Sequence, residues 1–366
     1  MIKNLILQCP INNMGYGITS YNIWKALSEK IQKIFLFPIG DVTTESYWNK
    51  EKILSDFNNQ NQYEKHTPCL KIWHPKDLIT KPHTERSIYA TYSFFETDHL
   101  STQEITSYNV ADIIFTPTNW ARQILINHGI ISSKIVVLPS GVDREIFNED
   151  ISIDPDESNT ENSKYIFLNI GKWEIRKGHD ILVHMFNKAF SEKDDVELWM
   201  LNYNSFLSSS ENDNWAKLYK NSKLGDKIKI FPRLPTQQHI AKLIKMSHCG
   251  IYPIRAEGWN NEALETMSMN KPVILTNYSG HTEYATKENS YLSSDIHQLE
   301  PALDGKFFKN EQAKWASLTP DTIDSMISHM RFVYKNKVHT NPKGLETSKQ
   351  LSWQNTANIV IKHLYT

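Results

Sequence analysis

Short apolar runs rich in β-branched residues alternate with amphipathic segments along this chain, and the alternation is interrupted once. Runs of this kind flanked by turn residues predict strands, and amphipathic segments between them, such as HDILVHMFNKAF (179–190) and TQQHIAKLIKM (236–246), predict crossover helices. The expected strands lie in NLILQC (4–9), KIFLFPI (33–39), LKIWH (70–74), SIYATY (87–92), ADIIFTP (111–117), KIVVLP (134–139), YIFLNIG (165–171), VELWML (196–201), KIKIFP (227–232), CGIYPI (249–254) and PVILTN (272–277). The pattern predicts an α/β protein with two parallel sheets.

The interruption is the stretch NEDISIDPDESNTENSK (148–164), which is acidic, rich in Asn and Ser, and without an apolar pattern. It predicts a linker over 151–163 between a first domain, 1–150, and a second, 164–345. A chain of 366 residues also favours two domains over one core. Because open parallel sheets bind ligands at the carboxyl ends of their strands, we expect a ligand cleft between the domains.

Composition excludes several classes of protein. The chain has 40% apolar and 22% charged residues, which is ordinary for a globular protein. Its net charge is −1 and neither half has a basic excess, so the composition does not indicate a dedicated nucleic-acid binder. The start, MIKNLILQC, lacks a signal-peptide core, and no stretch is long enough to span a membrane. We therefore expect a cytoplasmic protein, with peripheral membrane contact left open. Cys9, Cys69 and Cys249 show neither disulfide nor zinc spacing.

The first candidate for chemistry is NIGKWEIRKGHDIL (169–182), which follows a predicted strand and leads into a helix beginning near Gly178. Lys172, Arg176 and Lys177 therefore lie in a strand-to-helix loop, where cations and free amides together can bind phosphate. A solvated basic loop is the alternative interpretation.

The second candidate is EGWNNEALE (257–265), in which Asn260 or Asn261 is the expected N-cap of a helix. Glu257 would precede the helix and Glu265 would lie one turn inside it. Amides of Trp259, Asn260 and Asn261 could bind a diphosphate, and the two carboxylates could accept hydrogen bonds from hydroxyls. Ordinary acidity at a helix start would explain the same residues.

Glycines mark two further loops. KPVILTNYSGHTEYA places Gly280 after a strand, where close backbone approach is expected. INNMGYGITS places Gly15 and Gly17 before a helix whose predicted N-cap is Thr19 or Ser20. The third glycine of a dinucleotide fingerprint is missing, so a nicotinamide enzyme is disfavoured.

Taken in order, these segments resemble the retaining family 4 glycosyltransferases, which have the GT-B fold of two Rossmann-like domains facing across a cleft. EGWNNEALETMSMNKPVI is similar to the family's E-x7-E segment, and GKWEIRKGHDIL to its phosphate-binding segment. LSWQNTANIVIKHL resembles the closing helix, which implies that 346–366 packs back on the first domain. The resemblance runs from the first strand to the last helix.

The resemblance implies transfer of a sugar from a nucleotide-sugar donor to an acceptor hydroxyl, with no obligatory metal or other cofactor. Lys172 and Lys177 would hold the donor diphosphate, Glu257 would contact the sugar, and Glu265 would bind the ribose. Arg176 would add charge or face solvent. The implied donor site is completed by Gly15, Gly17, Gly258, Trp259, Asn260, Asn261 and Gly280.

The chain departs from the family pattern in two places. Asn260, Asn261 and Glu262 stand where small or apolar residues are more common, so the donor sugar cannot be inherited from the family. The usual histidine after a strand of the first domain is also missing from SIYATYSFFETDHL. Glu96 is the substitute that we expect to take part in catalysis, while His74 and Asp98 are candidates for acceptor contact.

Other readings stay open at this point. A glycosidase would use Glu257 and Glu265 as acid and nucleophile. A nucleotide-sugar isomerase or a silent nucleotide-sugar-binding module could share the fold. The lone D-x-D, Asp154 and Asp156, is interpreted as a solvated loop. The acceptor would be a glycan or a lipid-linked sugar, whereas nucleic acid is disfavoured by the charge balance.

Overall fold

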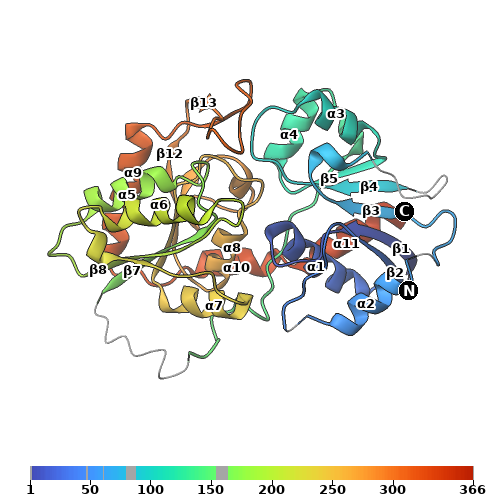
Figure 1. Cartoon of the computed structure of the whole chain (residues 1–366), viewed down its shortest axis with the longest axis horizontal. Coiled ribbons are helices and arrows are strands. Elements are labelled where there is room, and N and C mark those ends of the chain that lie inside the picture. Colours follow the sequence, from blue (N-terminus) through green and yellow to red (C-terminus); the bar gives the residue numbers. More distant parts are fainter. Residues whose placement is uncertain (1, 47, 61, 80–87, 154–163, 366) are drawn as a thin grey trace. The chain divides into compact units, whose positions relative to one another are not determined.

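The computed structural model describes residues 2–46, 48–60, 62–79, 88–153 and 164–365. Two compact units make up the chain, the first Met1–Asp143 with Leu351–Thr366 and the second Arg144–Gln350. Each unit holds a six-stranded parallel sheet covered by helices, as the alternating pattern predicted (Figure 1). No helix in these described ranges combines the length and apolar character needed to cross a bilayer.

The sheet of the first unit has the strand order β2-β1-β3-β4-β5-β6, and every pair is parallel. Its strands are β1 (Ile2–Cys9), β2 (Ile31–Pro38), β3 (Cys69–Ile72), β4 (Tyr89–Tyr92), β5 (Ile113–Thr116) and β6 (Ile135–Val137). Its helices are α1 (Gly15–Ser28), α2 (Lys50–Asn58), α3 (Thr102–Asn109), α4 (Asn119–Asn127) and α11 (Trp353–Tyr365), with short 3-10 turns η1 (Pro75–Asp77) and η2 (Ser132–Lys134).

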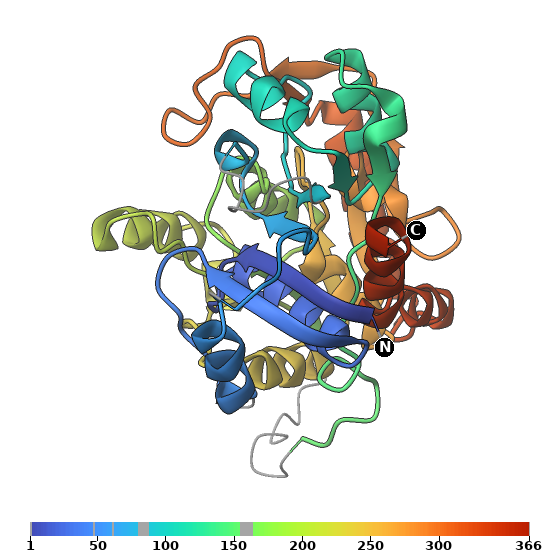
Figure 2. The same ribbon diagram turned by 90° about the vertical axis from the view of Figure 1, so that its right-hand side faces the viewer.

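Alternation along β1 explains how this sheet is covered on both faces. Leu5 and Leu7 pack in one core with α1 and α11, and Ile6 packs in the other core with α3 and α4. In Figure 2, α11 runs beside the strands of the first unit. Trp353 and Val360 of α11 are buried in the same core as α1, so the last helix of the chain is part of the first unit.

The second unit has the strand order β12-β11-β10-β7-β8-β9, again all parallel, and a separate antiparallel pair β13-β14. Its strands are β7 (Tyr165–Gly171), β8 (Val196–Asn202), β9 (Ile228–Ile230), β10 (Cys249–Tyr252), β11 (Val273–Asn277), β12 (Tyr291–Asp295), β13 (Leu299–Pro301) and β14 (Lys314–Ala316). Its helices are α5 (His179–Ala189), α6 (Ser209–Lys220), α7 (Gln237–Met246), α8 (Asn261–Ser268), α9 (Pro320–Lys335) and α10 (Pro342–Gln350), with turns η3 (Gly225–Lys227) and η4 (Gly280–Glu283).

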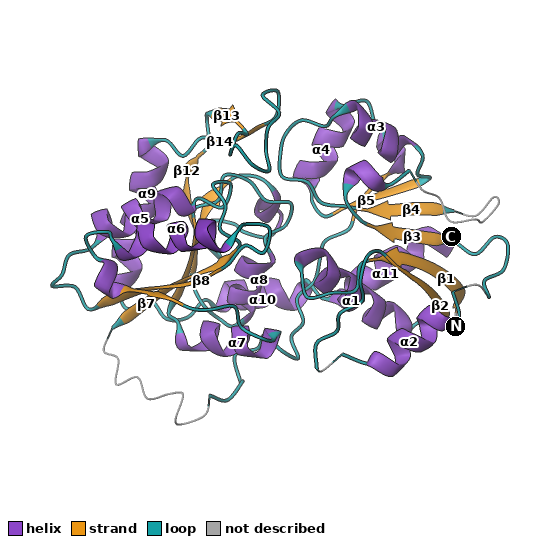
Figure 3. Ribbon diagram, in the orientation of Figure 1, coloured by secondary structure: helices purple, strands orange, loops and turns teal. Residues whose placement is uncertain are grey.

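Strand order in the second unit brings three loops together. Helices α5, α6 and α9 cover one face of the sheet, and α7, α8 and α10 lie on the opposite face (Figure 3). Because β10 pairs with both β7 and β11, the carboxyl ends of these three parallel strands are neighbours. The loops that follow them contain both candidate motifs and Gly280, so sheet topology itself places these segments side by side.

The start of α1 differs from the expectation. α1 begins at Gly15, with Met14 as its N-cap, so the N-cap predicted at Thr19 or Ser20 is wrong. Both residues are buried inside the helix, where tertiary packing outweighs their preference for helix ends.

The chain passes from one unit to the other between Asp143 and Arg144 and again between Gln350 and Leu351, whereas the sequence predicted boundaries at 150 and 346. Arg144 explains the first boundary, because its guanidinium donates to the hydroxyls of Ser268 (3.0 Å) and Ser348 (3.2 Å) in the second unit. Most of the predicted linker, with Asp154 and Asp156, lies outside the described residues.

Candidate functional site

The loop between β7 and α5 is shaped by two glycines. Gly178, the N-cap of α5, has a left-handed φ of 74°, and a Cβ there would lie 1.8 Å from the carbonyl oxygen of Pro253. At Gly171 (φ 151°), a Cβ would lie 2.9 Å from Cδ of Lys177. The absence of both side chains lets the loop fold over the end of β10 and lets Lys177 lie along β7.

A buried histidine supports this loop from beneath. Nδ1 of His179 lies 3.0 Å from the backbone nitrogen of Glu174, and Nε2 lies 3.0 Å from Oδ1 of Asn169, both at hydrogen-bond distance. The amide of Asn169 donates to the carbonyl of Ile251 (2.7 Å), which ties β7 to β10. Burial first, and then the charge of Lys177, lower the pKa of His179 to about 3. The imidazole is therefore neutral at physiological pH.

The lowered pKa of His179 predicts acid sensitivity. The folded-state pKa of His179 lies below the unfolded value of about 6.5. The contribution of neutral His179 to the unfolding free energy is therefore complete above pH 6.5 and is lost as pH falls toward 3. The slope for one such group is about 1.4 kcal/mol per pH unit. Urea unfolding of the wild type and His179→Asn between pH 7.5 and 5 should show a shallower pH dependence for the variant.

Burial also lowers the pKa of His248 to about 4, so His248 contributes to the pH dependence of the wild type. The difference in slope between the wild type and His179→Asn therefore isolates the contribution of His179. His184, exposed on the same helix, provides the control, because His184→Asn should keep the wild-type slope. Equal slopes for His179→Asn and the wild type would contradict the assignment.

The loop after β10 and the start of α8 form the opposite wall of the site. Asn260 is the N-cap of α8, as predicted, with a left-handed φ of 73° and its side-chain oxygen accepting the N–H of Ala263 (3.3 Å). The hydroxyl of Tyr284 donates to the carbonyl of Asn260 (2.6 Å). The ring of Tyr284 also packs against Trp259, with centroids 5.1 Å apart. These contacts fix the backbone that leads into the helix.

The loop after β11 holds Glu257 in place. The N–H of Glu257 donates to the hydroxyl of Ser279 (2.9 Å), and its carbonyl accepts the N–H of Gly280 (2.8 Å). A Cβ at Gly280 would lie 2.3 Å from the carbonyl oxygen of Gly258. The close approach expected at Gly280 is therefore present, and it is made to the glutamate loop.

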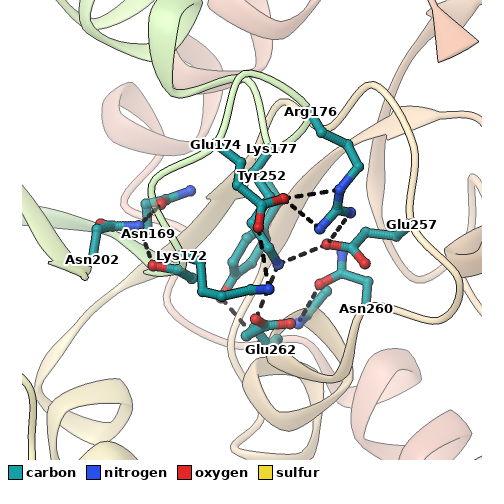
Figure 4. Close-up of polar contacts among 12 residues, drawn as sticks. Asn169, Lys172, Glu174, Arg176, Lys177, Asn202, Tyr252, Glu257, Asn260 and Glu262 are labelled. Atoms are coloured by element: carbon teal, nitrogen blue, oxygen red, sulfur yellow. Dashed lines mark hydrogen bonds and ion pairs between the residues drawn. The ribbon is translucent and has the colours of Figure 1, made fainter. Parts of the chain in front are cut away.

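Charged side chains from the first two loops meet in one ionic cluster (Figure 4). Nζ of Lys177 lies 2.6 Å from Oε1 of Glu257 and 3.1 Å from Oε1 of Glu262. Arg176 lies 2.9 Å from Glu257 and 2.8 Å from Glu174. The cluster joins the end of β7 to the start of α8.

Burial and charge act in opposite directions on these groups. Burial favours a raised pKa for Glu257, but Arg176 and Lys177 outweigh it and lower the pKa to about 2. For Lys177, burial favours a lowered pKa, but Glu257 and Glu262 outweigh it and the net shift is upward. Both groups therefore carry their full charge at any physiological pH.

Arg176 does not face solvent, which corrects one alternative drawn from the sequence. Its side chain is 5% exposed, and it donates to Glu174 through Nε (3.0 Å) and to the carbonyl of Ala256 through Nη1 (2.8 Å). Arg255 makes a second clamp, since it donates to both carboxylate oxygens of Asp180 (2.8 and 2.9 Å) and to the carbonyl of Ile175 (2.6 Å). Arg176 and Arg255 together join the loop after β7 to the loop after β10.

The remaining predicted residues of the second unit lie around this cluster. Lys172 has a half-exposed side chain and lies 3.2 Å from Glu174. Glu265 is the fifth residue of α8, one turn beyond Asn261 and on the same face. Glu174 and Glu262 were not assigned from the sequence, although each stands close to a cation or an amide in its motif.

The candidates of the first unit lie near the carboxyl ends of its strands. Gly15 and Gly17 form the first turn of α1, and a Cβ at Gly17 would lie 2.2 Å from the carbonyl oxygen of Asn12. His74 is exposed after β3, with its ring 4.6 Å from that of Tyr16. Glu96 and Asp98 are partly buried in the loop after β4.

Family comparison identifies the kind of domain that carries the cluster. Residues 150–300 match the family model described as glycosyl transferases group 1. The uncharacterized glycosyltransferase MJ1059 of Methanocaldococcus jannaschii is 26% identical over 174 residues, which cover 46% of this chain and 40% of that protein. The chain thus spans about two fifths of the length of this curated relative.

Solved structures extend the similarity to the whole chain. A glycosyltransferase from Rickettsia africae ESF-5 superposes with a TM-score of 0.70 at 14% identity, covering 99% of this chain and 98% of that one. Anabaena Alr3699/HepE in complex with UDP-glucose gives a TM-score of 0.70 at 12% identity, with 100% and 99% covered. By sequence, residues 150–300 therefore resemble a group 1 glycosyltransferase domain, and the two parallel six-stranded sheets match GT-B glycosyltransferase structures, as expected.

Proposed function

We propose that this protein is a retaining glycosyltransferase of family 4, which transfers a sugar from a nucleotide-sugar donor to an acceptor hydroxyl. The observation that carries the proposal is the position of Lys177, a buried ammonium at the end of β7 beside the start of α8. The amide N–H groups of Asn261 and Glu262 make no hydrogen bond among the described residues. A cation and free helix amides are the groups that bind a diphosphate.

Charge development in the reaction explains why such groups would accelerate it. The bond between the anomeric carbon and the phosphate oxygen breaks, and a bond to the acceptor oxygen forms on the same face. The acceptor proton passes to an oxygen of the departing diphosphate, so no protein nucleophile is needed and configuration is retained. Lys177, with Lys172 at the half-exposed edge, would stabilise the negative charge on that leaving group without a metal.

The donor would lie along the loop after β10. Glu257 would accept a hydrogen bond from the sugar and Glu265 one from the ribose. The side-chain amide nitrogen of Asn260 is buried without an acceptor among the described residues, so its NH2 group can donate to an oxygen of the ligand. Gly258 and Trp259 would cover the sugar, and Arg176 would act through Glu257 by holding its carboxylate.

The first unit would supply the acceptor side. Gly15 and Gly17 would approach the donor phosphates, Glu96 would contact the reacting hydroxyl, and His74 and Asp98 would bind the acceptor, a glycan or a lipid-linked sugar. Among the described residues, none lies within 4 Å of a Cβ built at Gly15, so its backbone is open to a ligand.

Glu257 is poorly suited to the role of acid that a glycosidase would require. A general acid must hold a proton at working pH, whereas Arg176 and Lys177 lower the pKa of Glu257 to about 2. Lys177 beside the amides of Asn261 and Glu262 supports a phosphate ligand over a simple glycoside.

The test is a thermal-shift panel of UDP-, GDP-, ADP- and dTDP-sugars on the wild type and Glu265→Ala, followed by assays of sugar release from each binder. One nucleotide series should stabilise the wild type by several degrees and the variant less, because the variant lacks the ribose acceptor. Slow release of sugar with retained anomeric configuration should follow. Binding without turnover toward any acceptor would favour a silent module, and conversion of the donor alone would favour an isomerase.

A further inference from the structure

Lys177, which we propose binds the donor diphosphate, already forms ion pairs with two carboxylates. Oε1 of Glu257 and Oε1 of Glu262 both lie within 3.1 Å of its Nζ. The cluster as a whole holds three cations and three carboxylates, Lys172, Arg176, Lys177, Glu174, Glu257 and Glu262. It is therefore electrically neutral, and an arriving diphosphate would add at least two negative charges without a free cation to meet them.

The two carboxylates on Lys177 are held very differently. Glu257 also pairs with Arg176 at 2.9 Å, and its backbone is bound on both sides by the Ser279 to Gly280 loop. Within the described ranges, Lys177 is the single ion-pair partner of Glu262. The Glu262 side chain is 24% exposed, against 10% for Glu257. Displacing Glu262 breaks one ion pair, whereas displacing Glu257 breaks two, with Lys177 and with Arg176.

From this asymmetry, and resting on the proposed function, we infer that Glu262 is a specificity-determining residue for the donor sugar. In the free protein its carboxylate holds Lys177 in competition with phosphate. When the donor binds, the diphosphate takes the place of Glu262 on Lys177, and the released carboxylate accepts hydrogen bonds from sugar hydroxyls.

The covalent structure of the donor makes both contacts compatible. The anomeric carbon is bonded to an oxygen of the phosphate that Lys177 would hold, so the nearest ring hydroxyls lie within a few bonds of that site. Glu262 is the second residue of α8 and points to the same ammonium. A neutral, hydroxyl-rich sugar offers donors to its carboxylate, whereas the carboxylate of a uronic acid would be repelled.

This arrangement makes donor binding depend on the sugar. A free nucleoside diphosphate must displace Glu262 and offers nothing in return, whereas a nucleotide hexose supplies hydroxyls to the displaced carboxylate. Glu262 therefore weakens retention of the nucleoside diphosphate product more than binding of the donor.

The experiment is isothermal titration of UDP, UDP-glucose and UDP-glucuronate into the wild type, Glu262→Gln, Lys177→Ala and Glu288→Gln, with the corresponding ADP or GDP series if the thermal-shift panel selects that base. Glutamine keeps the size of Glu262 but removes the charge that competes for Lys177. We expect Glu262→Gln to bind UDP about tenfold more tightly, which is the effect of losing one competing ion pair. Its preference for UDP-glucose over UDP and over UDP-glucuronate should shrink by a similar factor.

Glu288→Gln is the matched control, because Glu288 is an exposed carboxylate of the same unit paired with Lys343. It should leave all three affinities unchanged, which separates the local contact from the net charge of the unit. One outcome would overturn the role of Glu262 while the proposed function stands: Lys177→Ala abolishes UDP binding, but Glu262→Gln binds UDP no more tightly than the wild type. No binding of any nucleotide to any of these proteins would overturn both.

Discussion

Lys177→Ala is expected to lower turnover by about a hundred- to a thousandfold at saturating donor, the range seen when one group that stabilises a developing oxyanion is removed. Lys177 is the buried cation of the cluster, with 8% of its side chain exposed, so water cannot replace its charge as it could on a surface. The measurement is kcat for sugar release or transfer with the donor that the panel selects, on protein shown to be folded by its thermal midpoint.

Two other lysine variants serve as comparisons for the loss of turnover in Lys177→Ala. Lys172→Ala should lower kcat by about tenfold or less, because the Lys172 side chain is 46% exposed and solvent screens its charge. Lys188→Ala, which removes an exposed lysine paired with Asp324 on the surface, should leave kcat unchanged. Full turnover by Lys177→Ala would mean that the diphosphate does not bind at the end of β7.

Glu257→Gln is expected to lower the unfolding free energy of the second unit by about 3 kcal/mol. Arg176 and Lys177 lower the pKa of Glu257 to about 2, so the folded unit favours its ionised carboxylate. The variant also leaves Arg176 and Lys177 with less negative charge beside them, and breaking a buried pair by removing one partner typically costs about 3–5 kcal/mol. Urea unfolding at pH 7 measures the loss.

The sign of the pH dependence provides an internal check. Because the folded-state pKa of Glu257 is depressed, its contribution is complete above pH 4.5 and is lost as pH falls toward 2, so the stability difference between wild type and Glu257→Gln should narrow below pH 4.5. Inorganic diphosphate should restore more stability to the variant than to the wild type, since it supplies the missing negative charge. Glu288→Gln, at an exposed ion pair, should change stability by less than about 1 kcal/mol. An equal loss for both variants would show that the cluster does not stabilise the unit.

The sequence predicted local structure well wherever the signal was local. Gly178 before α5 and Asn260 before α8 were both recognised as helix starts, because a left-handed glycine and an asparagine N-cap act within a few residues of themselves. The start of α1 was misplaced because Met14 caps the helix without any side-chain hydrogen bond, so no residue signalled it. Thr19 and Ser20, which did carry a capping signal, are buried within the helix.

Sequence reasoning found four charged members of the cluster, Lys172, Arg176, Lys177 and Glu257, and missed Glu174 and Glu262. Glu174 pairs with Lys172 and Arg176, each two residues away, but spacing along the chain did not show that these side chains meet. Glu262 meets Lys177 across 85 residues, and no periodicity in either segment signals that contact. His179 was read only as part of a helix start, because its neutral state depends on burial beneath a loop.

By itself, the sequence determined the alternating α/β pattern, the two units and the two motifs that carry the cations and the glutamates, since these depend on short-range periodicity and turn chemistry. Tertiary structure alone decided that β10 lies between β7 and β11, and this order brings the carboxyl ends of three distant strands together. It also decided which charges are buried and paired, so that Arg176 joins Glu174 to Glu257 and Glu262 pairs with Lys177. Electrostatic energy depends on distance and dielectric in space, and neither can be read from spacing along the chain.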